Sequence, residues 1–122
     1  MRNINRVARF TLAFVFFYHG LVPKILWVSP AEAVLTNAHH LDSAIFSPIA
    51  GVLEMLLAVS IVVFRRSLVP VYIAAVALFA LLLDVMVVMP SLFIEAFNPL
   101  TINITAIVLA YITCVTHSQT MR

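Results

Sequence analysis

The chain has 122 residues, of which 64% are hydrophobic and 10% are charged, and its mean hydropathy is +1.13. Soluble domains are typically about 45–50% apolar and about 25% charged, so this composition excludes an ordinary soluble domain and indicates an integral membrane protein. The net charge is +2, and no nucleic-acid partner is expected. The single cysteine, Cys114, excludes an intrachain disulfide and a CxxC redox pair.

Four apolar segments follow one another along the chain, at residues 7–28, 45–64, 68–89 and 97–115. Each is close to the about 20 residues that a helix needs to cross about 30 Å of hydrocarbon. The sequence therefore predicts an all-α fold. We expect one transmembrane domain over residues 1–122, built as an antiparallel four-helix bundle in the lipid bilayer, with its longest connection at residues 29–44.

The breaks between these segments carry helix-starting signals. Residues 29–32 (SPAE) form a capping box with proline at the first helical position, which predicts a short surface helix in the long connection. Residues 47–48 (SP) and 98–99 (NP) repeat the order of cap and proline, so the second and fourth long helices are expected to begin near them.

The basic residues are distributed unevenly about the four segments. Six of the seven Lys and Arg residues fall on one side if both termini are cytoplasmic: Arg2, Arg6, Arg9, Arg65, Arg66 and Arg122. Cytoplasmic loops are enriched in Lys and Arg, so we predict an N-in, C-in orientation. A cleaved signal peptide is disfavoured, because the first apolar segment is longer than a signal core and Lys24 interrupts its end.

Five polar residues lie within the apolar segments and form the candidate ligand-binding centre: His19, Lys24, Glu54, Asp84 and Asn103. Polar groups are costly in hydrocarbon and usually face the bundle interior, where they pair with one another or mark a functional site. Counting from the cytoplasmic ends places these residues at similar depth. The sequence therefore predicts one connected polar network in the outer half of the bundle, and no metal site.

The sequence leaves two interpretations open for several of these polar residues. His19 is either a proton carrier or a ligand for a quinone-like head group, or a structural partner of Glu54 or Asp84. A bare charge near the middle of a helix is poorly tolerated, so Glu54 is expected to be paired or protonated. We favour His19 over Lys24 as the partner of Glu54, because Lys24 lies closer to water and could reach the outer head groups.

Small residues and one proline are expected to shape the helix contacts. Pro23 removes a backbone donor and frees the carbonyl of His19, which predicts a kink beside Gly20. Small residues allow close helix approach in lipid, so Gly51 is expected at a helix contact and Val62 on the lipid-facing side. Four alanines are expected at contacts as well: Ala58, Ala77, Ala106 and Ala110.

The chain resembles the DoxX-like family of small four-helix bacterial membrane proteins. The resemblance covers about residues 10–112 and rests on YHGLVPKILW (residues 18–27), GVLE (residues 51–54), Asp84 and AFNPLTIN (residues 96–103). Membership implies a multi-pass protein of the bacterial cytoplasmic membrane. Some relatives are similar to membrane subunits of quinone-linked sulfur oxidation and terminal-oxidase systems, and related chains occur fused to short-chain dehydrogenase-like domains.

The sequence agrees with three different functions. The resemblance and the polar centre favour a membrane subunit of a redox system that binds quinone or lipid, with a separate redox protein as partner. A proton-coupled transporter would also use a carboxylate near the membrane midplane and a helix kinked by proline. A structural or assembly protein would use its buried charges only to specify helix pairing. Four short helices bury little surface, which favours homo-oligomerisation in each case.

The predicted orientation can be tested by cysteine labelling. In a Cys114→Ala background, Arg65→Cys should react with a membrane-impermeant maleimide only after the cytoplasmic side is opened. Residue 65 lies in the basic turn that the Lys and Arg distribution places inside. Labelling of residue 65 in intact cells would reverse the orientation.

Overall fold

The computed structural model describes residues 1–120, and every regular element within them is helical. Long helices alternate with short helical turns in the connections. In chain order the elements are α1 (Arg2–Leu21), the π-helical turn η1 (Val22–Leu26), α2 (Pro30–Ala38), α3 (Ser43–Val63), α4 (Val69–Val88), the 3-10 turn η2 (Pro90–Ile94) and α5 (Pro99–Thr120).

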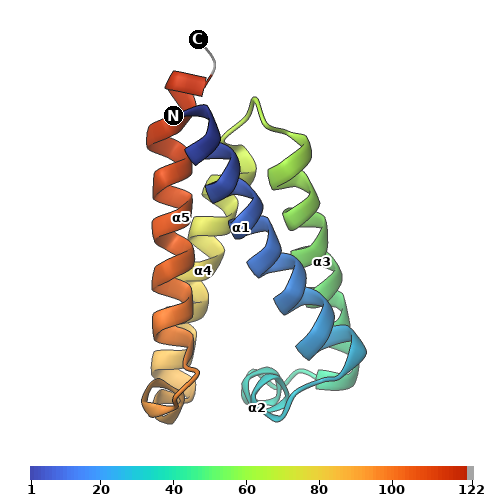
Figure 1. Ribbon diagram of the computed structural model, residues 1–122. Coiled ribbons are helices and arrows are strands. Elements are labelled where there is room, and N and C mark those ends of the chain that lie inside the picture. Colours follow the sequence, from blue (N-terminus) through green and yellow to red (C-terminus); the bar gives the residue numbers. More distant parts are fainter. Residues whose placement is uncertain (121–122) are drawn as a thin grey trace.

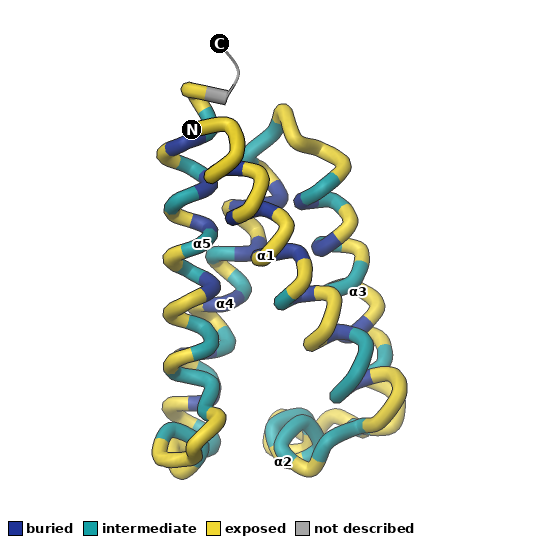
Figure 2. Tube along the Cα trace, viewed as in Figure 1, coloured by how far each residue is buried: buried dark blue, intermediate teal, exposed yellow. Residues whose placement is uncertain are grey.

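Four helical segments of the described chain are long and apolar enough to cross a membrane. They are Arg2–Leu26, Ser43–Val63, Val69–Val88 and Pro99–Gln119. Exposed residues occur along the whole length of these helices (Figure 2). They include large apolar residues such as Phe14, Val76 and Val87. Such a surface is not stable in water, so the long helices are membrane spans and the outward side chains face lipid.

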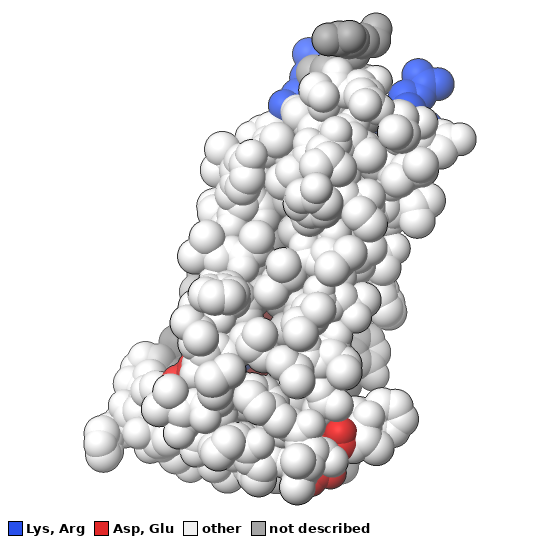
Figure 3. Space-filling model, turned by 90° about the vertical axis from the view of Figure 1, so that its left-hand side faces the viewer, with Lys and Arg blue, Asp and Glu red and all other residues white. Residues whose placement is uncertain are grey.

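The two ends of the molecule differ in composition. Both termini of the described chain and the α3–α4 turn lie at one end, which we call the termini end, and α2 and η2 lie at the other, which we call the α2 end (Figure 1). On the face shown in Figure 3, Lys and Arg gather at the termini end, while Asp and Glu lie towards the α2 end. Arg122, predicted on the arginine-rich side, lies outside the described residues.

Helix α1 is the centre of the packing. It contacts α3 along one side and α5 along the other, and α5 packs against α4, whereas α3 and α4 make few contacts with each other. The core formed between these helices consists of Leu12, Ala13, Phe16, Ala58, Ile61, Val71, Ala74, Leu78, Ala106 and Ala110. Most of these residues belong to the middle of the spans and to the termini end, so the α2 end is less completely filled.

A buried arginine joins the helices at the termini end. Arg9 is only 3% exposed. Its guanidinium donates to the carbonyl of Ile61 at 3.1 Å and to the carbonyl of Ser67 at 3.0 Å, while its Nε donates to Asn5. The carbonyls at a helix C-terminus carry partial negative charge, so the end of α3 stabilises this cation without a carboxylate.

Asn5 extends this network to the last helix. Its Nδ2 donates to the carbonyl and to the hydroxyl oxygen of two threonines of α5, Thr113 and Thr116, at 2.9 Å each. By its position in the sequence, Arg9 is predicted to be one of several cytoplasmic charges. The structure instead gives Arg9 and Asn5 a joint structural role, in which one polar cluster connects α1, α3, the α3–α4 turn and α5.

Two glycines mark the contact between α1 and α3 near the α2 end. A Cβ built on Gly20 would collide with the carbonyl oxygen of Gly51, and a Cβ built on Gly51 would collide with the carbonyl oxygen of Gly20. Each glycine therefore lies directly against the backbone of the other helix. This approach needs two residues without side chains, which is the arrangement that lets helices pack closely in lipid.

Several helix boundaries differ from the sequence prediction. Helix α1 begins at Arg2 and α5 extends to Thr120, so both continue beyond the apolar segments. Helix α3 begins at Ser43, where the Asp42 carboxylate accepts from the N–H of Ala44, and Pro48 lies inside the helix rather than at its start. Apolar patterning cannot show where a helix leaves the hydrocarbon, because polar residues continue a helix equally well in water.

Two other starts lie where the sequence predicts them. Helix α2 begins at Pro30 after the cap Ser29, and α5 begins at Pro99, where the Asn98 side chain accepts from the N–H of Thr101. Val62, by contrast, was predicted to face lipid and is partly buried against the core. The prediction failed because Val62 packs against the core cluster, although it also lines the spaces beside Phe10 of α1.

Replacing a glycine at the α1–α3 contact should separate these two helices. We expect Gly51→Leu to lower the free energy of unfolding in detergent by about 3 kcal/mol, the upper end of the usual cost of overpacking, because the opposing atom is backbone and cannot rotate away. The matched control is Val52→Leu, since Val52 is 48% exposed on the same helix. Equal stability of the two variants would contradict this packing.

Candidate functional site

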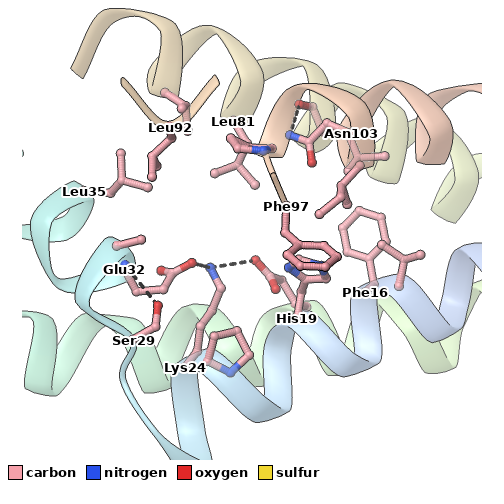
Figure 4. A pocket seen from close by; sticks show the side chains of 18 residues that line it. Phe16, His19, Lys24, Ser29, Glu32, Leu35, Leu81, Leu92, Phe97 and Asn103 are labelled. Atoms are coloured by element: carbon pink, nitrogen blue, oxygen red, sulfur yellow. Dashed lines mark hydrogen bonds and ion pairs between the residues drawn. The ribbon is translucent and has the colours of Figure 1, made fainter. Parts of the chain in front are cut away.

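A cavity of about 260 Å³ lies at the α2 end, between the long helices and α2. Its walls are mostly apolar, and Leu35, Leu81 and Leu92 lie on the side opposite α1 and η1 (Figure 4). Its polar lining includes four of the five residues predicted for the centre: His19, Lys24, Glu54 and Asn103. The cavity forms here because the buried core lies mainly elsewhere and because α3 and α4 make few contacts.

Helix geometry and the glycine contact bring Lys24 to the cavity. Gly20 and Lys24 are four residues apart and therefore share a helix face, the one turned towards α3. Cβ atoms built on Gly20 and Gly51 would lie 3.0 Å from the Cβ atoms of Glu54 and Lys24, respectively. The missing side chains thus leave room for the lysine and the glutamate to approach one another.

Pro23 changes the form of the helix at this position. The sequence predicts a kink, and the structure shows a π-helical turn, in which the N–H of Trp27 donates to the carbonyl of Val22 at 3.1 Å. The N–H of Ser29 donates to the carbonyl of Pro23 at 2.9 Å as the chain leaves the turn. Wide helical turns of this kind are frequent at functional sites.

Lys24 forms ion pairs with two carboxylates. Its Nζ lies 2.8 Å from Oε1 of Glu32 and 3.2 Å from Oε1 of Glu54, and the lysine side chain is only 7% exposed. The two dashed lines that meet at Lys24 in Figure 4 mark these contacts. Lys24 therefore does not extend to the membrane surface, and it is Lys24 rather than His19 that pairs with Glu54.

One oxygen of Glu54 has no hydrogen-bond partner among the described residues. Oε2 is buried, while Oε1 faces Lys24. A buried acceptor without a donor costs about 1–3 kcal/mol, more when the group is charged. Such an atom beside a cavity is therefore a candidate contact for a bound molecule that carries a hydroxyl or N–H group.

His19 and Asn103 line the cavity without joining the ion pairs. Asn103 is half-buried, and its Nδ2 lies 3.4 Å from the carbonyl of Leu78, a weak hydrogen bond that leaves its other donor and its oxygen free for a ligand. His19 is exposed, packs edge-on against Tyr18 and makes no ion pair in the part of the chain described. Both side chains are thus available to a molecule in the cavity.

Asp84 does not belong to this centre. It does not line the cavity, and its Oδ1 lies 2.9 Å from Nε2 of His39, the residue that ends α2. The prediction of one network containing His19, Glu54 and Asp84 is therefore wrong. His19 is not part of the ion pairs, and Asp84 belongs to a separate pair. Asp84 pairs with His39 beside α2, a partner that counting along the spans did not include.

Helix α2 covers the cavity and is attached on several sides. Glu32 in its first turn pairs with Lys24, the hydroxyls of Thr36 and Ser47 lie 3.2 Å apart, and His39 pairs with Asp84. Ser29 caps the helix by accepting from the N–H of Glu32 at 3.3 Å. The Glu32 carboxylate thus binds Lys24 rather than completing the reciprocal capping box that the sequence suggests.

A double-mutant cycle tests the Lys24–Glu54 pair. We expect Lys24→Met to destabilise the protein by about 3–5 kcal/mol, because it leaves a buried carboxylate without its cation, and Lys24→Met/Glu54→Gln to recover much of that loss. Unfolding free energies in mixed micelles provide the measurement. The combination of Lys24→Met with Asp84→Asn is the control and should be additive, whereas additivity between positions 24 and 54 would remove the pair.

Comparison with known proteins identifies the family. No curated protein and no solved structure matches the chain. The family model described as the DoxX-like family matches residues 13–111, which include the glycine contact, the lysine and both cavity carboxylates. This match confirms the resemblance carried by residues 18–27 and 96–103, and the chain is a member of the DoxX-like family.

Proposed function

We propose that this protein is the membrane subunit of a quinone-linked redox system and that it holds the ring of a quinone or quinol in the cavity beneath α2. The observation that carries the proposal is the unpartnered, buried oxygen of Glu54 beside a mostly apolar cavity. Ligand pockets usually combine apolar walls with a few convergent polar groups, and this cavity has that composition.

The polar groups fit both redox forms of such a ring. A quinone carbonyl accepts hydrogen bonds, and Asn103 and His19 can donate to it. A quinol hydroxyl donates, and the free oxygen of Glu54 can accept. The ligand supplies two-electron, two-proton chemistry when bound, and Glu54 and His19 are the residues of this chain placed to take up protons there.

The size of the cavity limits the ligand. Its volume of about 260 Å³ is slightly below the about 300–1,000 Å³ of typical small-molecule pockets. It therefore suits one ring system rather than a ring with its full isoprenoid tail. The few contacts between α3 and α4 leave a direction in which a tail can reach the lipid.

The proposal includes an orientation, a compartment and partners. An antiparallel bundle with the termini end in the cytoplasm agrees with the arginines at that end and with the shared position of the termini (Figures 1 and 3). The family favours the bacterial cytoplasmic membrane.

Electrons would be exchanged with a separate redox protein. The outer surfaces of α3 and α4 are apolar and offer area for homo-oligomerisation.

A proton-coupled transporter is the alternative, and the packing supports it less. Transport requires access to the site from both sides of the membrane. Towards the termini end the space between the helices is filled by core residues such as Leu12, Ile61 and Val71, each 0% exposed. An inward path would have to open through these residues and past the Arg9 cluster.

Quinone binding by the purified protein tests the proposal. Titration with a short-chain ubiquinone or naphthoquinone in nanodiscs, followed by calorimetry, should give saturable binding. Glu54→Gln should weaken binding of the quinol form by roughly 10- to 100-fold, the effect expected for the loss of a hydrogen bond to a charged acceptor.

The matched control is Asp84→Asn, which neutralises a carboxylate outside the cavity and should leave quinone and quinol affinity unchanged. An equal loss in both variants, or no quinone binding by the unmodified protein, would refute the proposal. Solute flux into proteoliposomes that depends on Glu54 would establish the transporter instead.

A further inference from the structure

A second cavity, of about 190 Å³, lies at the termini end between α1, the end of α3 and the α3–α4 turn. Arginines from two separate segments converge on it: Arg2, Arg6 and Arg9 from α1, and Arg65 and Arg66 from the turn. No acidic side chain of residues 1–120 lines it. Five cations around one small space repel one another unless an anion lies among them.

The arginines differ in what they are free to do. Arg9 is buried and already engaged with backbone carbonyls, so it forms a fixed positive base of the cavity. Arg2, Arg6, Arg65 and Arg66 are exposed and make no ion pair with any described residue. Their guanidinium groups can therefore bind a phosphate, which arginine recognises with two parallel hydrogen bonds.

An apolar groove continues from this cavity along the outside of the α1–α3 contact. Phe10 and Val62 line both spaces, and the groove then passes Phe14, Phe17 and Val59. From residue 10 to residue 17 a helix rises about 10 Å, which is enough for a substantial part of one acyl chain. The two spaces together suit a molecule with an anionic head and a hydrocarbon tail.

We propose that the termini end of this protein binds one anionic phospholipid, with its phosphate among the arginines and an acyl chain in the groove between α1 and α3. A soluble phosphate would occupy the arginines and leave the groove empty, whereas a zwitterionic lipid would bring its own cation against them. Basic pockets between membrane helices on the cytoplasmic side are known to hold anionic head groups. The proposal does not depend on a ligand at the α2 end.

Lipid titration of the purified protein tests this site. Phosphatidylglycerol, added to delipidated protein in a neutral detergent, should raise the melting temperature saturably, and phosphatidylcholine with the same acyl chains should not. Arg65→Gln/Arg66→Gln should bind phosphatidylglycerol roughly 30-fold more weakly, as expected for the loss of two basic groups at an anionic surface. Both arginines are exposed, so the double variant should keep its fold.

Two further comparisons show whether the acyl chain as well as the phosphate of the lipid contributes to the stabilisation. Val59→Trp fills the groove without changing any charge and should weaken lipid binding, whereas Val76→Trp, on the exposed face of α4, should not. Equal stabilisation by glycerol 3-phosphate would show a soluble phosphate site and overturn the proposal. Equal stabilisation by phosphatidylcholine, or unchanged phosphatidylglycerol affinity in the arginine double variant, would overturn it as well.

Discussion

The close contact of Gly20 and Gly51 is the constraint on which the rest of the α2 end depends. Because neither residue has a side chain, the backbones of α1 and α3 meet, and Lys24 and Glu54 are brought together one helical turn away. The lysine then attracts Glu32 and so fixes the start of α2. A single steric feature thus determines the charge pair and, through it, the cover of the cavity.

The two ends of the molecule handle the cost of polar groups in a membrane in different ways. At the termini end the buried guanidinium of Arg9 is hydrogen-bonded to two backbone carbonyls and to the side chain of Asn5, and this cluster joins the helices. At the α2 end the cation has two carboxylates, one of which keeps a free oxygen beside an open space. A buried group whose hydrogen bonds are all made, such as Arg9, favours a structural role. A buried group with an unpaired atom, such as Glu54, favours binding, which is why the quinone proposal is placed at the α2 end.

The sequence predicted the helical spans, the capped starts of α2 and α5 and four of the polar residues around the cavity. These features depend on local patterns: apolar length, cap residues and the cost of a buried charge. The partners of the buried charged residues were less predictable. His19 was preferred over Lys24, and Asp84 was assigned to the centre, because depth along a span does not give the rotation of a helix or the path of a connection. Glu32 was not predicted among the residues of the polar centre for the same reason, although the capping motif located it correctly in α2.

The network of Asn5 and Arg9 also has a consequence for biosynthesis. Asn5 finds its acceptors 108 to 111 residues later in the chain, on the last helix, and Arg9 finds its own in residues 52 to 58 positions away. Until those segments have been made, Arg9 and Asn5 have only each other as partners, and their remaining polar groups need water. The packing of α1 at the termini end can therefore be completed only after α5 has been made.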